Sequence, residues 1–352
     1  MRKNVLLLFS VFLFLFADAQ IPPGYYDPTY GFNGLGLKIT LHNIIKNHSV
    51  ISYSGLFSVF QQTDNKGNNE VWDIYSDNPF GNPPYVYYFT NPSDMCGQYS
   101  QEGDCYNKEH SWPHSWFGSS SIPMYSDLFQ IYPTDGWVNN KRGNMPYGKV
   151  NNPSWTSLNG SKIGPCSSPG YSGNVFEPIN EYKGDIARSY FYVSVRYYGE
   201  DGSWTGSDQT IGAELKPWAF DLMYAWHTSD PVSQKETDRN DVIYLLQNNR
   251  NPFIDHPEWV DSIYFPVGIS TPLLAKPQIS IYPNPATDYL YVSASFVPDE
   301  ILITDALGKS LMLLHPPFEN SVPVNLKSLE KGYYFIQIKN KTYNSVHKLI
   351  KF

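Results

Sequence analysis

Residues 104–118 read DCYNKEHSWPHSWFG, so the carboxylate of Glu109 stands directly before the imidazole of His110. An imidazole can accept a proton near neutral pH, and a carboxylate oxygen is a ligand for hard divalent cations. A metal-assisted hydrolase needs both groups, one to activate water and one to hold the cation. The stretch therefore predicts a strand or turn that carries this pair within a hydrolytic site.

Two zinc-protease patterns are excluded by spacing. A helical His-Glu-x-x-His motif has the opposite order, and Pro113 would break a helix that carried both His110 and His114. The inverted His-x-x-Glu-His motif needs a histidine at position 106, where this chain has Tyr106. The absence of a Cys-x-x-Cys pair also argues against cysteine-ligated zinc.

A second ligand is expected from residues 134–144, which read TDGWVNNKRGN. Thr134 or Asp135 could cap a helix there, and its polar face would offer amide oxygens and a guanidinium. Amide and carboxylate oxygens suit Mg²⁺ or Ca²⁺ better than thiophilic metals. Neighbours on a regular strand point to opposite faces, so a bulge or a strand end is required for Glu109 and His110 to share one cavity.

The N-terminal residues 1–19 have the pattern of a secretory signal peptide. Arg2 and Lys3 precede an apolar run at 5–16, and Ala17-Asp18-Ala19 supplies a small-residue cleavage site. The apolar run is shorter than the roughly 20 residues that a membrane helix needs. We expect a secreted, soluble protein without a membrane span, and a monomer.

Charge limits how this protein could hold a polyanion. The formal charge is −8, and it becomes −10 for residues 20–277 because residues 1–19 and 278–352 each carry +1. An acidic body argues against nucleic-acid binding through a broad basic face. Any polyanion must be bound locally, by a cation and a few Arg or Lys side chains.

Three cysteines, Cys96, Cys105 and Cys166, would enter an oxidising compartment. Cys96 and Cys105 are close in sequence, and a bridge between them would fix the loop that leads to Glu109. We favour that pair, although the sequence leaves the other pairings open.

The composition, 41% hydrophobic and 16% charged over 352 residues, indicates a globular chain with more than one domain. We expect one domain over 20–270, a linker over 271–278 and a second domain over 279–352. In the first domain, apolar periodicity predicts helices at 34–48, 135–144, 185–198 and 233–247, and strands at 71–75 and 85–90. In the second, alternating segments separated by turn residues predict a small all-β sandwich.

The last segment carries a specific set of motifs: YPNP at 282–285, DALG at 305–308, LEKGY at 329–333 and KLIK at 348–351. In this combination it resembles the C-terminal sorting domain of the type IX secretion pathway. The resemblance implies that the domain is an export address, read by the type IX machinery and often removed after outer-membrane passage. The alternative is a carbohydrate-binding or structural sandwich.

The first domain also carries ordered motifs over most of residues 25–265. They are YNKEHSWP at 106–113, DLFQIYPTDGWVNNKRGN at 127–144, FEP at 176–178, KGDIAR at 183–188 and QNNRNPFID at 247–255. Together they resemble secreted bacterial endonuclease I, whose members use a ββα-metal, or His-Me finger, site. The implied fold class is α+β, with a ββα-metal core embedded in a larger helix- and loop-rich domain.

The resemblance implies that His110 is the general base and that Glu109 and Asn139 hold one Mg²⁺ or Ca²⁺ ion. Asn140 and Asn144 compete with Asn139 for that assignment. A neutral imidazole is required, so activity is expected to fall as His110 is protonated in mild acid. The substrate would be DNA, with RNA as a second candidate, contacted mainly through its phosphates.

Two arginines are further candidates, because a guanidinium can clamp a phosphate through its fork of donors. These are Arg142 and Arg188, although Arg188 could instead pair with Asp185 on one helix. Related sequences often have histidine near position 130, where this chain has Gln130. That departure puts a substrate contact or a supporting contact in doubt.

Other classes of function remain open at this stage. The aromatic-rich body could bind glycans, and paired carboxylates could make a glycoside hydrolase. His114, Trp112 and Trp116 are expected to wall the site, and His227 and His256 to have structural roles. The sequence does not decide whether the metal is Mg²⁺ or Ca²⁺, or whether the substrate is DNA or RNA. It also leaves open whether the C-terminal domain is removed or retained.

Overall fold

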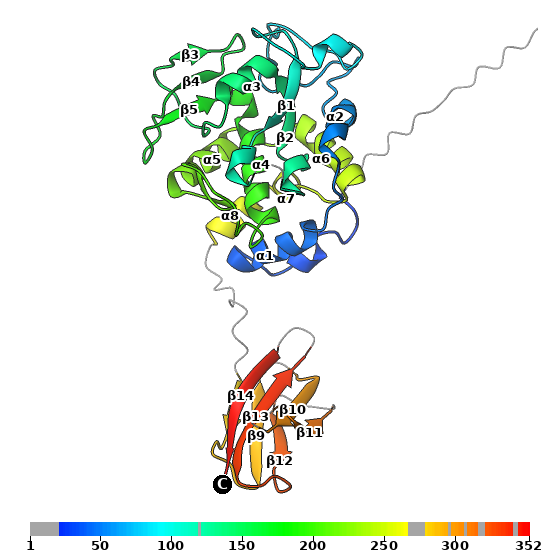
Figure 1. Ribbon diagram of the computed structural model, residues 1–352, viewed down its shortest axis with the longest axis vertical. Helices are drawn as coiled ribbons and strands as arrows, with labels where there is room; N and C mark the ends of the chain where they lie inside the picture. The colour runs from blue at the N-terminus through cyan, green and yellow to red at the C-terminus, as the bar shows by residue number, and fades with distance from the viewer. Residues whose placement is uncertain are drawn as a thin grey trace, which may run out of the picture. The chain divides into compact units, whose positions relative to one another are not determined.

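The computed structural model describes residues 21–118, 121–266, 279–294, 297–305, 308–315, 321–340 and 344–352. The chain divides into two compact units, with the division between Ile269 and Ser270 (Figure 1). The expected signal peptide at 1–19 and the expected linker at 271–278 lie outside the described residues. Each unit is described below by itself.

Eight α-helices lie in the described part of the first unit. They are α1 (Gly34–Ile45), α2 (Leu56–Thr63), α3 (Gly136–Arg142), α4 (Lys183–Arg196), α5 (Pro217–Ser229), α6 (Gln234–Gln247), α7 (Pro252–Asp255) and α8 (Trp259–Tyr264). Helix α4 is the central one, because every residue from Gly184 to Arg196 is buried and the helix contacts α1, α5 and α7. The four helices predicted from periodicity are confirmed, with shifts of a few residues at their ends.

The functional segment forms a hairpin followed by a helix. Strands β1 (Tyr106–His110) and β2 (Ile131–Asp135) pair antiparallel in a regular register that sets Glu109 opposite Tyr132. Asp135 ends β2 and caps α3, since its carboxylate accepts a hydrogen bond of 2.7 Å from the Val138 amide. Figure 1 shows this ββα arrangement, with α3 beside the two strands. The predicted ββα core within a mixed α+β domain is confirmed.

Two predicted strands are wrong. Residues 71–75 and 85–90 form only isolated bridges, Asn65 with Val71 and Glu70 with Tyr88. Val71 and Tyr87 are buried with Tyr106 in a small cluster, whereas Ile74 and Tyr75 are buried in the main core of the unit. The remaining strands of this unit are short: β3 (Trp155–Thr156), β4 (Lys162–Pro165) and β5 (Asn174–Glu177) form one sheet, and β6 (Thr210–Ile211) pairs with β7 (Glu214–Leu215).

The second unit is built from strands alone in its described part. Strands β8 (Ile279–Tyr282), β9 (Tyr289–Ala294) and β12 (Ser321–Asn325) form a sheet in the order β12-β9-β8. Strands β10 (Glu300–Thr304), β11 (Ser310–Leu314), β13 (Gly332–Lys339) and β14 (Asn344–Lys351) form the other, in the order β11-β10-β13-β14. Alternate residues of both sheets, including Leu290, Ile303 and Ile336, are buried in one core, so the predicted small β-sandwich is confirmed.

Neither unit offers a membrane-spanning helix: among the described residues, none is both long and apolar enough to cross a bilayer.

Candidate functional site

A cavity of about 240 Å³ opens where β1 meets α3. Glu109, His110 and Asn139 all line it, so the structure brings together three of the five residues predicted from the sequence. His110 is the last residue of β1, which meets the requirement for a strand end at this point. The other lining residues are Tyr53, Tyr99, Asn107, Lys108, Pro113, His114, Tyr125, Asn140, Gly143 and Asn144.

Glu109 is 3% exposed and is held by two donors at one oxygen. Its Oε1 accepts hydrogen bonds from the hydroxyl of Tyr75 at 2.7 Å and from Nη1 of Arg142 at 2.5 Å. Burial raises the pKa of the Glu109 carboxyl, while the guanidinium of Arg142 opposes that shift by favouring the charged form. Among the described residues no donor is bonded to Oε2, so this oxygen is the one left for a ligand in the cavity.

The ring of His110 is held in one tautomer by the main chain. Its Nε2 lies 3.1 Å from the carbonyl oxygen of Tyr125, and a carbonyl only accepts, so Nε2 carries the proton and Nδ1 has the free lone pair. The rings of Tyr125 and Tyr53 stack over the imidazole at centroid distances of 5.2 and 5.9 Å. Burial lowers the pKa of His110 to about 4, so the imidazole stays neutral to a lower pH than an exposed histidine would.

Asn139, on α3, is oriented by its amide nitrogen. Nδ2 donates to Oδ1 of Asn107 at 2.6 Å and to the main-chain oxygen of Lys108 at 3.3 Å. No donor among the described residues is bonded to the carbonyl end, Oδ1. Glu109 and Asn139 therefore line one cavity, and each has a side-chain oxygen to which no donor of the described residues is bonded.

That donor set fits a hard divalent cation, which prefers oxygen ligands and retains waters at its other positions. It is a small set: within the described ranges, no three or more His, Cys, Asp or Glu side chains are grouped so that they could hold a metal ion. Two protein oxygens beside a cavity of this size suit Mg²⁺, which is often bound through one or two carboxylates and keeps several waters.

Arg142 is a correction to the sequence prediction. The side chain is fully buried and does not line the cavity. Its guanidinium donates to Glu109, to the main-chain oxygen of His110 at 2.9 Å and to that of Ser111 at 2.7 Å, and it stacks 4.1 Å from the ring centroid of Tyr147. Arg142 thus holds the end of β1 and the Glu109 carboxylate in place, and it has no free fork for a phosphate.

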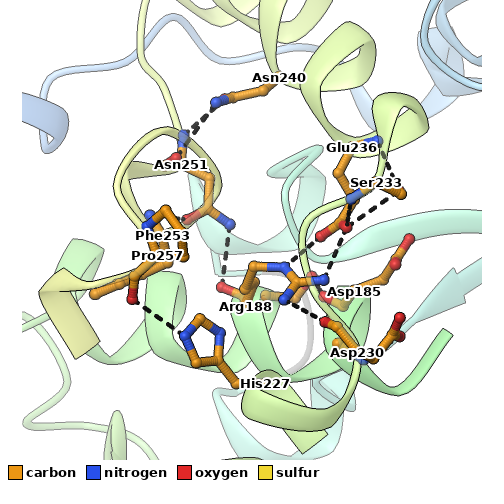
Figure 2. Close-up of polar contacts among 12 residues, drawn as sticks. Asp185, Arg188, His227, Asp230, Ser233, Glu236, Asn240, Asn251, Phe253 and Pro257 are labelled. Atoms are coloured by element: carbon orange, nitrogen blue, oxygen red, sulfur yellow. Dashed lines mark hydrogen bonds and ion pairs between the residues drawn. The ribbon is translucent and has the colours of Figure 1, made fainter. Parts of the chain in front are cut away.

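Arg188 is a second correction, because the structure places it away from the cavity. It is 1% exposed, and its guanidinium donates to both carboxylate oxygens of Glu236 and to the main-chain oxygen of Asp230 (Figure 2). The pairing with Asp185 that the sequence allowed is not formed either, since Asp185 binds Lys235 at 2.7 Å. Arg188 ties α4 to the start of α6 and has a structural role.

Gln130, the position where relatives often have histidine, is also buried. Its amide nitrogen donates to the main-chain oxygen of Met124 at 2.8 Å, in the same short segment that carries Tyr125. It therefore supports the segment whose carbonyl holds His110. Sequence reasoning missed Tyr53, Tyr75 and Tyr125, which lie outside the quoted motifs and carry no spacing signal.

A disulfide joins Cys96 and Cys105, as favoured from the sequence, and Cys166 is free. The bridge lies at the start of β1, and the main-chain oxygen of Cys105 accepts a hydrogen bond of 2.9 Å from the Gly136 amide at the start of α3. It therefore fixes the strand and the helix that supply the cavity with Glu109 and Asn139.

Residues 33–258 match the Endonuclease I family, and residues 280–352 match the secretion system C-terminal sorting domain. The chain is 34% identical over 247 residues to the extracellular ribonuclease of Bacillus subtilis (strain 168), which covers 68% of this chain and 78% of that protein. The same coverage at 35% identity is found for the extracellular ribonuclease of Bacillus amyloliquefaciens.

A more distant similarity, 28% over 134 residues, links the chain to the extracellular deoxyribonuclease of Aeromonas hydrophila, over 38% of this chain and 50% of that protein. The family match spans the whole ββα segment and most of the helices around it, and it favours the nuclease over the glycan-binding and glycosidase alternatives. The chain belongs to the Endonuclease I family and, with its sorting domain, is a secreted nuclease.

Proposed function

We propose that the protein is a divalent-metal-dependent endonuclease that hydrolyses phosphodiester bonds of DNA and RNA without sequence specificity, with His110 as general base. The observation that carries the proposal is the tautomer of His110: its Nδ1 has a free lone pair, and the residue lines the same cavity as Glu109 and Asn139. Similarity to proteins named extracellular ribonuclease and extracellular deoxyribonuclease supports both substrates.

In the proposed reaction, Nδ1 of His110 accepts a proton from a water molecule, whose oxygen forms a bond to phosphorus as the bond to the 3′ oxygen breaks. Nε2 keeps its proton on the carbonyl of Tyr125, so the ring does not turn as its charge changes. Glu109 and Asn139 would hold the Mg²⁺ or Ca²⁺ ion. When bound, that ion would offset charge on the phosphate and on the departing oxygen.

Low sequence specificity is expected from the same geometry. Neither predicted arginine reaches the cavity, so few cationic donors are available to read base edges. Contacts to the phosphates and to the metal would then provide most of the binding.

The test is cleavage of supercoiled plasmid and of a single-stranded RNA by the mature protein, with Mg²⁺, with Ca²⁺ and with EDTA. We expect cleavage of both nucleic acids in the presence of a cation and none with EDTA. Glu109→Gln and Asn139→Ala should raise the cation concentration needed for half-maximal activity. Full activity in EDTA, or an unchanged cation requirement in both variants, would overturn the proposal.

A further inference from the structure

A second hollow of about 210 Å³ adjoins the cavity of the site. Tyr53, Asn107 and Lys108 line both, and Phe57 and Cys96 complete the second one. The two hollows are therefore neighbouring compartments that share Lys108 in their walls. The first contains the proposed base, and the proposed function assigns no role to the second.

Lys108 is placed to serve both compartments. It stands two residues before His110 on β1, so the two side chains leave the same face of the strand about 6.8 Å apart along it. That spacing is close to the distance between successive phosphates along a single strand of nucleic acid.

The ammonium of Lys108 has no acidic partner in the part of the chain that the structure describes. It lies instead between two aromatic faces, with Nζ 4.1 Å from the ring centroid of Tyr53 and 4.3 Å from that of Phe57. Among the other half-buried lysines of this unit, Lys183 pairs with Glu177, whereas Lys46, Lys162 and Lys216 form no ion pair within the described residues. What distinguishes Lys108 is that its ammonium lies between two ring faces in a hollow next to the site. In a half-buried position, a cation held only by ring faces is left to bind an anion from outside.

The walls of this second compartment suit a nucleotide. Tyr53 and Phe57 are half-buried. The ring of Tyr53 already has Lys108 Nζ 4.1 Å and the ring of Tyr125 4.4 Å from its centroid, so a base would stack on Phe57. Aromatic faces stack on any base, which matches an enzyme without sequence preference. Residues 20–277 carry a net negative charge, so a lysine close to the site would contribute much of the attraction for a second phosphate.

Building on the proposed function, we propose that Lys108, with Tyr53 and Phe57, forms a subsite for the nucleotide next to the cleaved bond, and that Lys108 binds the phosphate of that nucleotide. The ligand class is a nucleic-acid strand with at least two successive phosphates. Lys108 is therefore a substrate-positioning residue, and it should affect KM and the dependence on salt more than kcat.

The experiment compares wild type with Lys108→Met, which keeps an unbranched apolar chain between the two rings, and with Lys108→Arg, which restores the charge. The substrates are two single-stranded oligonucleotides. In one, a single phosphodiester is flanked by neutral methylphosphonate links; in the other, the neighbouring link is also a phosphodiester. KM and kcat are measured for each across a series of KCl concentrations at fixed Mg²⁺.

For wild type, we expect kcat/KM to be about tenfold higher for the oligonucleotide with two charged phosphodiesters than for the one with a single charged phosphodiester. The difference should come from a lower KM. In Lys108→Met that advantage should disappear, and the slope of log KM against log salt should fall by about 0.7. Lys108→Arg should recover most of both effects. Lys149→Met removes one exposed lysine that lines neither compartment, and it should keep the wild-type advantage.

A purely structural Lys108 gives a different result. In that case Lys108→Met would lower the melting temperature and leave both the charge advantage and the salt slope at their wild-type values, which would overturn the inference. Failure of the proposed function is separate from this result, since it would appear as metal-independent cleavage, or no cleavage, by the wild-type protein.

Discussion

Arg142 Nη1 lies 2.5 Å from Glu109 Oε1, and both side chains are almost completely withdrawn from solvent. The pair connects α3 to β1 and fixes one oxygen of the carboxylate, which leaves the other oxygen to the cavity. A buried charge without its partner is costly, so this contact links the stability of the domain to the position of the proposed metal ligand.

Replacing Arg142 with methionine should therefore lower stability and cation affinity together. Breaking a buried pair by removing one partner typically costs about 3–5 kcal/mol, and loss of the Arg142 guanidinium would raise the pKa of the buried Glu109 carboxyl further and so weaken it as a metal ligand. Urea unfolding and Mg²⁺ titration by calorimetry measure the two effects. Lys141→Met, an exposed neighbour on α3, is the control and should change unfolding by no more than about 0.5 kcal/mol. If Arg142→Met and Lys141→Met change the unfolding free energy and the Mg²⁺ affinity equally, the Arg142–Glu109 pair contributes little to either.

Gly136 should tolerate no side chain. A Cβ at this position would lie 2.5 Å from Sγ of Cys96 and 2.9 Å from the ring of Tyr99, so either the disulfide or the start of α3 would have to move. We expect Gly136→Ala to cost about 1–3 kcal/mol of unfolding free energy and to weaken cation binding through Asn139. At Gly97 a Cβ would meet nothing within 4 Å, so Gly97→Ala is the matched control. Wild-type stability and cation affinity in Gly136→Ala would contradict this account of the disulfide.

Asp73 makes stability depend on pH. Its buried carboxyl accepts the amide of Asp135 at 2.8 Å, and burial first and the Asp135 charge second raise its pKa from 3.8 to about 8. Between these values the folded chain keeps a proton that the unfolded chain releases. The contribution to stability is therefore complete below about pH 4 and is lost as the pH rises to about 8, at up to about 1.4 kcal/mol per pH unit.

Asp73→Asn should flatten that dependence, because an amide does not titrate. Urea unfolding at several pH values between about 5 and 8 gives the slope, with the exposed Asp221→Asn as control. If Asp73→Asn and wild type lose stability in parallel over this range, the buried carboxyl is not the group responsible.

The sequence was most informative where local rules apply. The helix at 233–247 has a Ser233 cap that accepts the Glu236 amide, with Glu236 bonding back to the Ser233 amide, and such a capping box is visible in sequence. The strands expected at 71–75 and 85–90 do not form, because their buried residues lie in irregular segments: Val71 and Tyr87 pack in a small cluster, and Ile74 and Tyr75 in the main core. Apolar composition alone does not distinguish the two cases.

For the site, the residues that line the cavity could be predicted from the sequence. The roles of the two arginines could not. Glu109, His110 and Asn139 lie in motifs, and the hairpin and the following helix bring them together. Arg142 points into the protein because it donates to the main-chain oxygens of His110 and Ser111, which are 32 and 31 residues away in sequence. Arg188 does so because it binds the carboxylate of Glu236, which is 48 residues away. Such partners are set by tertiary packing and leave no spacing pattern.

The central claim is that the His110 imidazole removes the proton from the attacking water. The most direct test is the single-turnover cleavage rate of His110→Ala at saturating Mg²⁺, with cation affinity measured in the same sample. We predict a rate about 10²–10⁴-fold below wild type with cation affinity retained, because the ring moves a proton and Glu109 and Asn139 bind the ion. A His110→Ala rate within a few-fold of wild type would contradict the account.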